Sequence, residues 1–256
     1  MLLPLTFFTI GFKLFTSGVI SKRFEFMRIA VLDLAGHPLP LLEGLSRSGE
    51  LIISWLSPAL PEGVFRWYDV EQNGEELPNL NTFDGVVISG SDHGVYDATP
   101  WNRLVRIFLL DCRRAGKPIF GICFGHQMMA DTFGGHAENA KIGVSVGARA
   151  FQFSESSQDA HVWHKDQVTI VPPRARITAN APYCPVGALE YDFPATSVQF
   201  HPEYSEYQLC EIVRRSRDVF LSSAQADGAI ESFAQTDVKP DLMAQETAAF
   251  FRKYLS

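Results

Sequence analysis

The chain has 256 residues, a formal net charge of −7 and 46% hydrophobic residues. This length allows one α/β domain with a well-buried core. The acidic charge and the absence of a basic run argue against nucleic acid as a main partner, because phosphate binding needs clustered Lys and Arg. The four cysteines form no C-x-x-C pair, which argues against zinc, a redox pair or a disulfide framework and favours a reducing compartment such as the cytoplasm.

The first 26 residues form an apolar, Phe-rich segment ahead of the first clear strand. Lys13 interrupts the apolar run, so no stretch reaches the roughly 20 residues that a membrane helix needs. A basic n-region and a clear cleavage site are lacking, although the sparse Lys, Arg, Ser and Thr are faintly typical of an organelle presequence. We expect residues 1–26 to be an extension outside the core and residues 27–256 to form a single domain.

Short apolar segments bounded by turn residues recur along the rest of the chain. The predicted strands are 28–34, 64–70, 85–89, 118–122 and 196–200. Helical periodicity covers residues 101–115 and 126–133 between them. Strands that alternate with helices pair in parallel and place a site at their carboxyl ends. The sequence therefore predicts an α/β fold with a doubly wound, mostly parallel sheet and flanking helices.

The later part of the chain departs from this alternation. Segments 168–171 and 186–191 are expected to form a smaller antiparallel lobe. Residues 205–256 are predicted to be helical, held to the rest of the protein by apolar packing anchors. These anchors are Val213, Phe220, Phe233, Phe250 and Phe251.

A cysteine stands between two glycines in the sequence GICFGHQ, residues 121–127. It follows a predicted strand and opens a helix, so Cys123 lies on a tight turn like that of a G-x-S-x-G nucleophile elbow. The glycines allow a strained turn, and the helix N-terminus favours the thiolate. The amide of Phe124 can point at a developing oxyanion. The alternative, a small buried cysteine in the sheet, does not explain both glycines.

A second motif, VQFHPE at residues 198–203, supplies a base. His201 lies just past a predicted strand, and Pro202 imposes extended geometry on the backbone. Residues two apart on an extended segment point the same way, so Glu203 can accept the ring N–H of His201. His201 would then take a proton from Cys123 and later protonate a leaving amine. Alone, His-Pro-Glu would be more simply a surface turn.

The two motifs together resemble the class I, triad-type glutamine amidotransferases. VVISGS at residues 86–91 resembles the strand and loop that provide the second oxyanion amide, and WHKDQV at 163–168 resembles the HGD segment that lines the glutamine pocket. FGG at residues 133–135 resembles the LGG that closes the helix after the nucleophile. The resemblance extends from about Arg28 to about Tyr204, and is greatest to the stand-alone, GMP-synthase-like group, to which plant γ-glutamyl peptidases are related.

The resemblance implies a flavodoxin-like fold and a role for each matching residue. Cys123 would form a γ-glutamyl thioester, His201 would be the general base and acid, and Glu203 would orient His201. Backbone amides of Phe124 and of Gly90 or Ser91 would hold the oxyanion. The substrate pocket would be bordered by Gln127, Trp163, His164 and Asp166.

Two departures from the family pattern bear on the substrate. The usual SGGP loop is SGSD at residues 89–92, and the usual HGD is HKD at residues 164–166. Both leave the thioester chemistry intact, but they weaken the expectation that glutamine is the preferred γ-glutamyl donor.

Three functions remain open from the sequence. The first is hydrolysis of glutamine to glutamate, with the ammonia passed to a separate synthetase chain. The second is unaided hydrolysis of γ-glutamyl peptides by the same triad. The third is a non-catalytic regulatory module, which the intact Cys123, His201 and Glu203 argue against. We expect no cofactor, no metal, and neither nucleic acid nor a membrane as partner.

Overall fold

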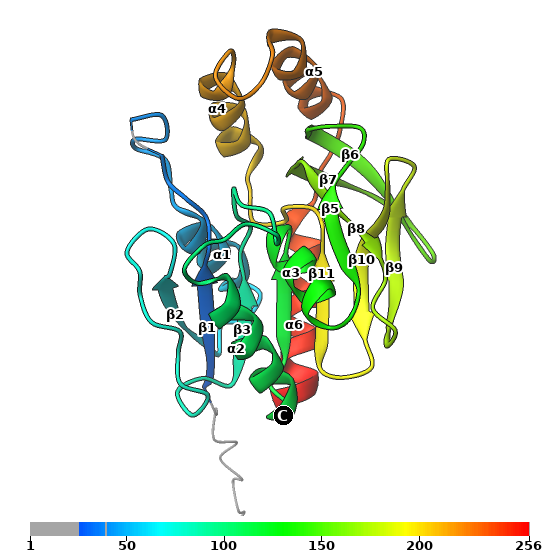
Figure 1. The fold of residues 1–256 in the computed structure, drawn as a ribbon. Coiled ribbons are helices and arrows are strands. Elements are labelled where there is room, and N and C mark those ends of the chain that lie inside the picture. Colours follow the sequence, from blue (N-terminus) through cyan, green and yellow to red (C-terminus); the bar gives the residue numbers. More distant parts are fainter. Residues whose placement is uncertain (1–25, 39, 256) are drawn as a thin grey trace, which may run out of the picture.

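The computed structural model describes residues 26–38 and 40–255 (Figure 1). Within these ranges the main sheet has nine strands, in the order β2-β1-β3-β4-β11-β10-β9-β6-β7. The first five strands in this order pair in parallel: β2 (Gly63–Asp69), β1 (Met27–Asp33), β3 (Gly85–Ile88), β4 (Ile119–Ile122) and β11 (Ala195–Val198). The other four extend the sheet in antiparallel fashion: β10 (Cys184–Tyr191), β9 (Ala175–Ala181), β6 (Ser145–Phe153) and β7 (Ser157–His164).

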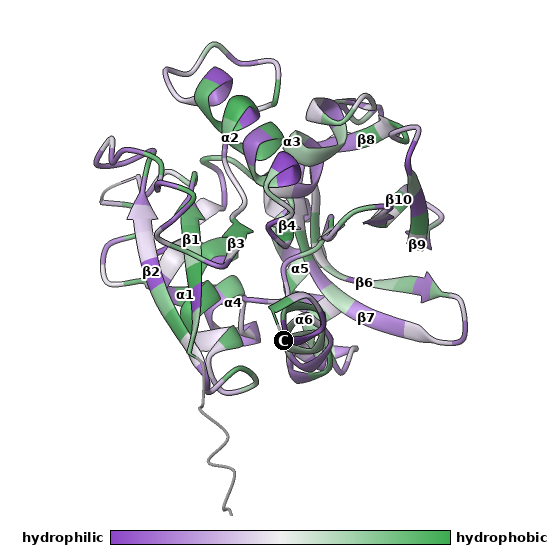
Figure 2. Ribbon diagram, turned by 90° about the horizontal axis from the view of Figure 1, so that it is seen from below, coloured by the Kyte–Doolittle hydropathy of each residue, from purple (hydrophilic) through white to green (hydrophobic). Residues whose placement is uncertain are grey.

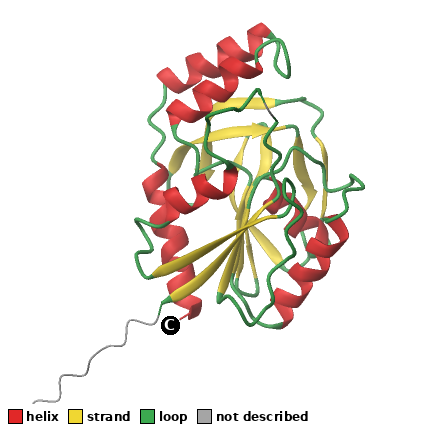
Figure 3. Ribbon diagram, turned by 90° about the vertical axis from the view of Figure 1, so that its left-hand side faces the viewer, coloured by secondary structure: helices red, strands yellow, loops and turns green. Residues whose placement is uncertain are grey.

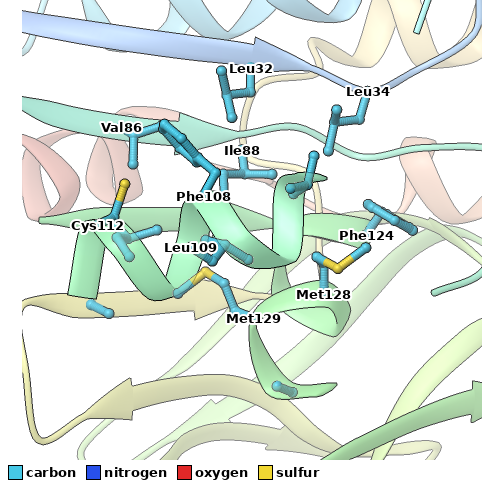
Figure 4. Close-up of a cluster of buried hydrophobic side chains, with 14 of the residues drawn as sticks. Leu32, Leu34, Val86, Ile88, Phe108, Leu109, Cys112, Phe124, Met128 and Met129 are labelled. Carbon is cyan, nitrogen blue, oxygen red and sulfur yellow. The ribbon is translucent and has the colours of Figure 1, made fainter. Parts of the chain in front are cut away.

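Helices cover both faces of the parallel strands. Successive side chains of a strand point to opposite faces, so β1 contributes residues to the hydrophobic core on each face of the sheet. Figure 2 shows this strand largely in the colour of hydrophobic residues. Ala30 and Leu32 pack with α2 and α3, in the cluster shown in Figure 4. Ile29 and Val31 pack with α1 and α6 on the opposite face. The four helices are α1 (Ser48–Leu56), α2 (Asn102–Arg114), α3 (Phe124–Thr132) and α6 (Pro240–Leu255).

Two further helices, α4 (Glu206–Ser216) and α5 (Ser223–Ala234), lie at one end of the molecule (Figures 1 and 3). That end is the one at which the parallel strands finish (Figure 1). Each helix starts at a serine whose side chain accepts a backbone N–H, Ser205 for α4 and Ser222 for α5. We call residues 205–236 the cap. The cap has a small core of its own, in which Leu209 and Phe233 pack with Val146 on β6.

The doubly wound arrangement confirms the predicted fold class. The predicted antiparallel lobe was wrong in part, because segment 186–191 belongs to β10 and pairs with β11 inside the main sheet. Segment 168–171 falls largely in β8 (Asp166–Ile170), which pairs with β5 (His136–Asn139) in a separate two-stranded sheet. Phe220 was also predicted wrongly, as a packing anchor, since 62% of its surface is exposed. The predicted extension lies outside the described residues as far as residue 25.

Candidate active site

Cys123 occupies a sharp turn between β4 and α3. Its backbone has φ 52° and ψ −99°, a conformation that side chains rarely allow. A Cβ atom on Gly121 would lie 2.5 Å from the sulfur of Met129, and one on Gly125 would lie 2.6 Å from the carbonyl oxygen of Ile88. Neither position has room for a side chain, so both glycines predicted to form the elbow are needed to build the turn.

Phe124 and Gly90, whose backbone amides were predicted to hold an oxyanion, lie beside Cys123. Phe124 is the first residue of α3, where a helical N–H has no acceptor within the helix. Gly90 follows β3 and lies against the other side of the site. A Cβ atom on Gly90 would be 3.0 Å from Cε1 of His201 and 3.7 Å from Cβ of Cys123. Because Gly90 has no side chain, the loop after β3 can approach both Cys123 and His201.

His201 and Glu203 form a buried pair immediately after β11. Nδ1 of His201 lies 2.7 Å from Oε1 of Glu203, and both residues are 5% exposed. The backbone N–H of His201 donates to the carbonyl of His161 on β7 at 2.8 Å, which fixes the segment. Burial lowers the pKa of His201, but the Glu203 carboxylate and the sulfur of Cys123 raise it more, so this pKa lies well above its ordinary value.

The side chains of Cys123 and His201 converge on one carbonyl oxygen, that of Trp163. Nε2 of His201 lies 3.3 Å from this oxygen, and Sγ of Cys123 lies 3.7 Å from it. Both ring nitrogens of His201 therefore face acceptors, because Nδ1 faces the Glu203 carboxylate. This environment favours the imidazolium form of His201.

A second group of buried polar residues lies next to Cys123. Nε2 of Gln127 donates to the backbone carbonyl of Asp166 at 2.8 Å and to Oε1 of Gln199 at 3.2 Å. His164 donates from Nδ1 to the same carbonyl at 3.0 Å and stacks on the ring of Tyr183. Burial lowers the pKa of His164 to about 4, so His164 is neutral at neutral pH.

The carboxylate of Asp166 is only partly satisfied. Oδ1 accepts hydrogen bonds from the hydroxyl of Tyr96 and from Nδ2 of Asn139, both at 3.2 Å. Oδ2 is buried and has no hydrogen-bond partner among the described residues, and the same holds for Nε2 of His164. Burial raises the pKa of Asp166. Two unpartnered polar atoms at this place mark a position where a polar ligand group can bind.

A cavity of about 790 Å³ joins these residues. Eight of the ten residues predicted for the site line it: Gly90, Ser91, Cys123, Gln127, Trp163, His164, Asp166 and His201. Glu203 reaches the cavity only through His201. Phe124 can offer only its backbone to the site, because its ring packs in the core against Trp101.

Gln199 was not predicted, although it lies within the VQFHPE motif. Its side chain is fully buried, and Nε2 donates to Sγ of Cys123 at 3.6 Å. The sequence feature that could have identified Gln199 is its position two residues before His201, on the same side of an extended segment. His126, in contrast, uses both ring nitrogens in structural contacts, with Ser197 at 2.8 Å and the carbonyl of Val186 at 3.2 Å.

The described residues include no group of three or more His, Cys, Asp and Glu side chains arranged to hold a metal ion. Within the same residues, no helix combines the length and the apolar character required to cross a membrane.

Comparison with known proteins identifies the family. The family model for glutamine amidotransferase class-I matches residues 63–214, more than half of the chain. Glutamine-hydrolyzing GMP synthases are similar to part of it: that of Listeria innocua is 30% identical over 173 residues, and that of Oceanobacillus iheyensis is 31% identical over 176. These matches cover 64% of this chain but only 32% and 33% of the relatives, so the chain spans about a third of their length.

Solved structures share the fold at low sequence identity. A glutamine amidotransferase from Thermotoga maritima superposes with a TM-score of 0.69 and 17% identity, covering 90% of this chain and 99% of the other. A glutamine amido transferase from Methylobacillus flagellatus superposes with a TM-score of 0.67 and 16% identity, covering 91% and 96%. On the strength of the family model, this chain belongs to the class I glutamine amidotransferases.

Proposed function

We propose that the protein hydrolyses the γ-glutamyl amide of glutamine through a thioester on Cys123. In this proposal His201 is the general base and acid, and Glu203 orients it. The observation that carries the proposal is the convergence of Sγ of Cys123 and Nε2 of His201 on the carbonyl of Trp163, with Glu203 2.7 Å behind the imidazole. A nucleophile, a base and an orienting group in contact are the pattern of covalent acyl transfer.

The proposed reaction has two stages, formation of a thioester and its hydrolysis. The thiolate of Cys123 attacks the γ-carbonyl carbon, and the amides of Phe124 and of Gly90 or Ser91 stabilise the oxyanion. The C–N bond then breaks while the imidazolium of His201 gives its proton to the departing nitrogen, which leaves as ammonia. Water, deprotonated by His201, attacks the thioester carbon. Glutamate leaves, and the sulfur of Cys123 is restored.

The glutamyl end of the substrate would bind beside Gln127 and Asp166. Oδ2 of Asp166 is a buried acceptor without a partner, which suits the α-ammonium group of an amino acid. The side-chain amide nitrogen of Gln127 already donates to Asp166 and Gln199, so the side-chain oxygen of Gln127 can act as a second acceptor for the substrate. Neutral His164 and the backbone of Trp163 would form the remaining wall.

The direct test is glutamate release from L-glutamine by the purified protein. Wild-type protein should release glutamate, and Cys123→Ala should abolish the release while keeping the fold by circular dichroism. Full activity of Cys123→Ala on glutamine and on γ-glutamyl peptides would refute the proposed nucleophile.

The ammonia acceptor is proposed to be a synthetase on a separate chain, as suggested by the similarity to part of glutamine-hydrolyzing GMP synthases. All four cysteines are free, which suits the cytoplasm or another reducing compartment. Such a subunit should hydrolyse glutamine slowly alone and faster with its synthetase.

A second candidate is unaided hydrolysis of γ-glutamyl peptides. The cavity volume favours it, since about 790 Å³ greatly exceeds what glutamine fills.

A further inference from the structure

The cavity changes character as it leaves the reacting atoms. Around Cys123 its wall is made of polar side chains and backbone amides, whereas under the cap it becomes apolar. The apolar wall consists of Leu41, Leu42, Leu209, Ile212, Phe220 and Leu221. We call these six residues the apolar subsite.

The cavity is larger than the reaction of glutamine requires. Pockets of about 300–1,000 Å³ hold ligands of drug-like size. At about 790 Å³, this cavity falls in the upper part of that range. Ammonia, the amine that leaves from glutamine, would occupy almost none of the space beyond the γ-carbonyl carbon.

The apolar subsite lies on the side of the leaving group. The glutamyl end is assigned to Gln127 and Asp166, whereas the leaving nitrogen must face His201, which protonates it. The cap begins at Ser205, directly after the His201 segment, and the ring of Tyr204 lies 4.9 Å from that of His201. A group attached to the leaving nitrogen would therefore enter the space beneath the cap.

The walls of this space are largely preformed. Leu209 and Leu221 are 1% and 2% exposed and belong to the core of the cap, against which Trp163 and Tyr204 also pack. Phe220 differs, because it lines the cavity while 62% of its surface is exposed. When an apolar ligand covers a large apolar side chain at the edge of a cavity, the burial of apolar surface stabilises the complex.

We infer that the apolar subsite binds the leaving amine, and that the preferred donors are γ-glutamyl conjugates of amino acids with large apolar side chains. This inference rests on the proposed thioester chemistry and leaves it unchanged. The same C–N bond breaks and the same proton passes from His201, but an amino acid leaves in place of ammonia.

Matched substrates test the inference. The kcat/KM of the purified protein is measured for γ-glutamylphenylalanine, γ-glutamylglycine and L-glutamine. The two peptides share a carboxylate and differ only in the apolar side chain, which should raise kcat/KM by about tenfold or more, because one buried apolar group is worth that much in discrimination. Equal values for the two peptides, or activity confined to glutamine, would overturn the inference.

Two neighbouring residues offer matched variants. Phe220 and Val219 are both 62% exposed, but only Phe220 lines the cavity. Phe220→Lys should reduce the ratio of kcat/KM for the phenylalanine conjugate to kcat/KM for the glycine conjugate by about threefold or more. Val219→Lys should leave this ratio unchanged. An equal effect of the two substitutions, or none from either, would contradict the assignment.

A binding measurement separates this inference from the proposed function. Calorimetry with Cys123→Ala, which cannot form a thioester, should show about tenfold tighter binding of γ-glutamylphenylalanine than of γ-glutamylglycine. Equal affinities would overturn the apolar subsite even if Cys123 proves to be the nucleophile. Retained turnover by Cys123→Ala would instead overturn the proposed function. Wild-type protein that hydrolyses none of the three substrates until a synthetase is added would also overturn the inference. That result would indicate that the cap is a protein-docking surface.

Discussion

The imidazole of His201 and the carboxylate of Glu203 lie 2.7 Å apart, in a pair withdrawn from solvent. Water cannot replace either partner, so the charged form of His201 depends on Glu203. Within the part of the chain that the structure describes, Oε2 of Glu203 is buried without a hydrogen-bond partner, and the carboxylate pairs with His201 through Oε1.

Glu203→Gln should lower kcat by about 10²- to 10⁴-fold, because the imidazolium loses the charge that stabilises it. Glu203 raises the pKa of His201, so the substitution should lower that pKa and move the basic limb of the pH–rate profile to lower pH. Steady-state kinetics across the pH range checks both effects. An unchanged basic limb would show that His201 does not supply the proton.

The same pair makes stability depend on pH. The folded-state pKa of His201 lies above its unfolded value of about 6.5, so the stabilisation is complete below about pH 6.5 and is lost as pH rises through the folded-state pKa. Urea unfolding of wild type and Glu203→Gln should therefore show a larger difference at about pH 6 than at about pH 9. A difference that grows with pH would contradict the assigned direction.

Gly90→Ala should impair activity more than stability. The new Cβ would lie 3.0 Å from the ring of His201, and a displaced ring no longer meets the leaving nitrogen. We expect kcat/KM to fall by about tenfold or more. Gly228→Ala on α5 is the control, because a Cβ there meets nothing within 4 Å. It should stabilise the protein by about 0.5–1 kcal/mol without affecting kcat/KM.

Gln199→Leu should lower kcat/KM by about tenfold, which corresponds to about 1.4 kcal/mol. The leucine keeps the approximate volume but removes the donor to Sγ of Cys123 and the acceptor for Gln127. Kinetics and thermal unfolding, measured together, distinguish a role of Gln199 in the reaction from a role in stability. A loss of stability without a change in kcat/KM would make Gln199 purely structural.

Asp166→Asn should raise KM for glutamine by about tenfold while kcat changes little, because the carboxylate would bind the ammonium group equally in ground and transition states. Glu138→Gln is a matched control, since Glu138 is a carboxylate on the neighbouring strand β5 with an exposed side chain. An unchanged KM in Asp166→Asn would remove Asp166 from the substrate site.

The sequence predicted the features that depend on a few neighbouring residues. The elbow at Cys123 follows from two glycines, and the His201–Glu203 contact follows from residues two apart on an extended segment. Gln199 and Phe220 depend instead on which distant segments meet. Burial of Gln199 is set by α3 and β11 together, and the exposure of Phe220 is set by the place of the cap. The pairing of β10 with β11 joins neighbouring segments of the chain, but the apolar pattern of segment 186–191 does not say which strand it pairs with.

The backbone conformation of Cys123 lowers the stability of the folded protein. A non-glycine residue held at φ 52° destabilises the native state by about 1–3 kcal/mol, a noticeable part of the 5–15 kcal/mol by which domains are stable. A chain selected for stability alone would carry glycine at this position. Under the proposed function, Cys123 is a position where a reactive side chain is kept although the backbone conformation favours glycine, so stabilising substitutions are best sought elsewhere in the chain.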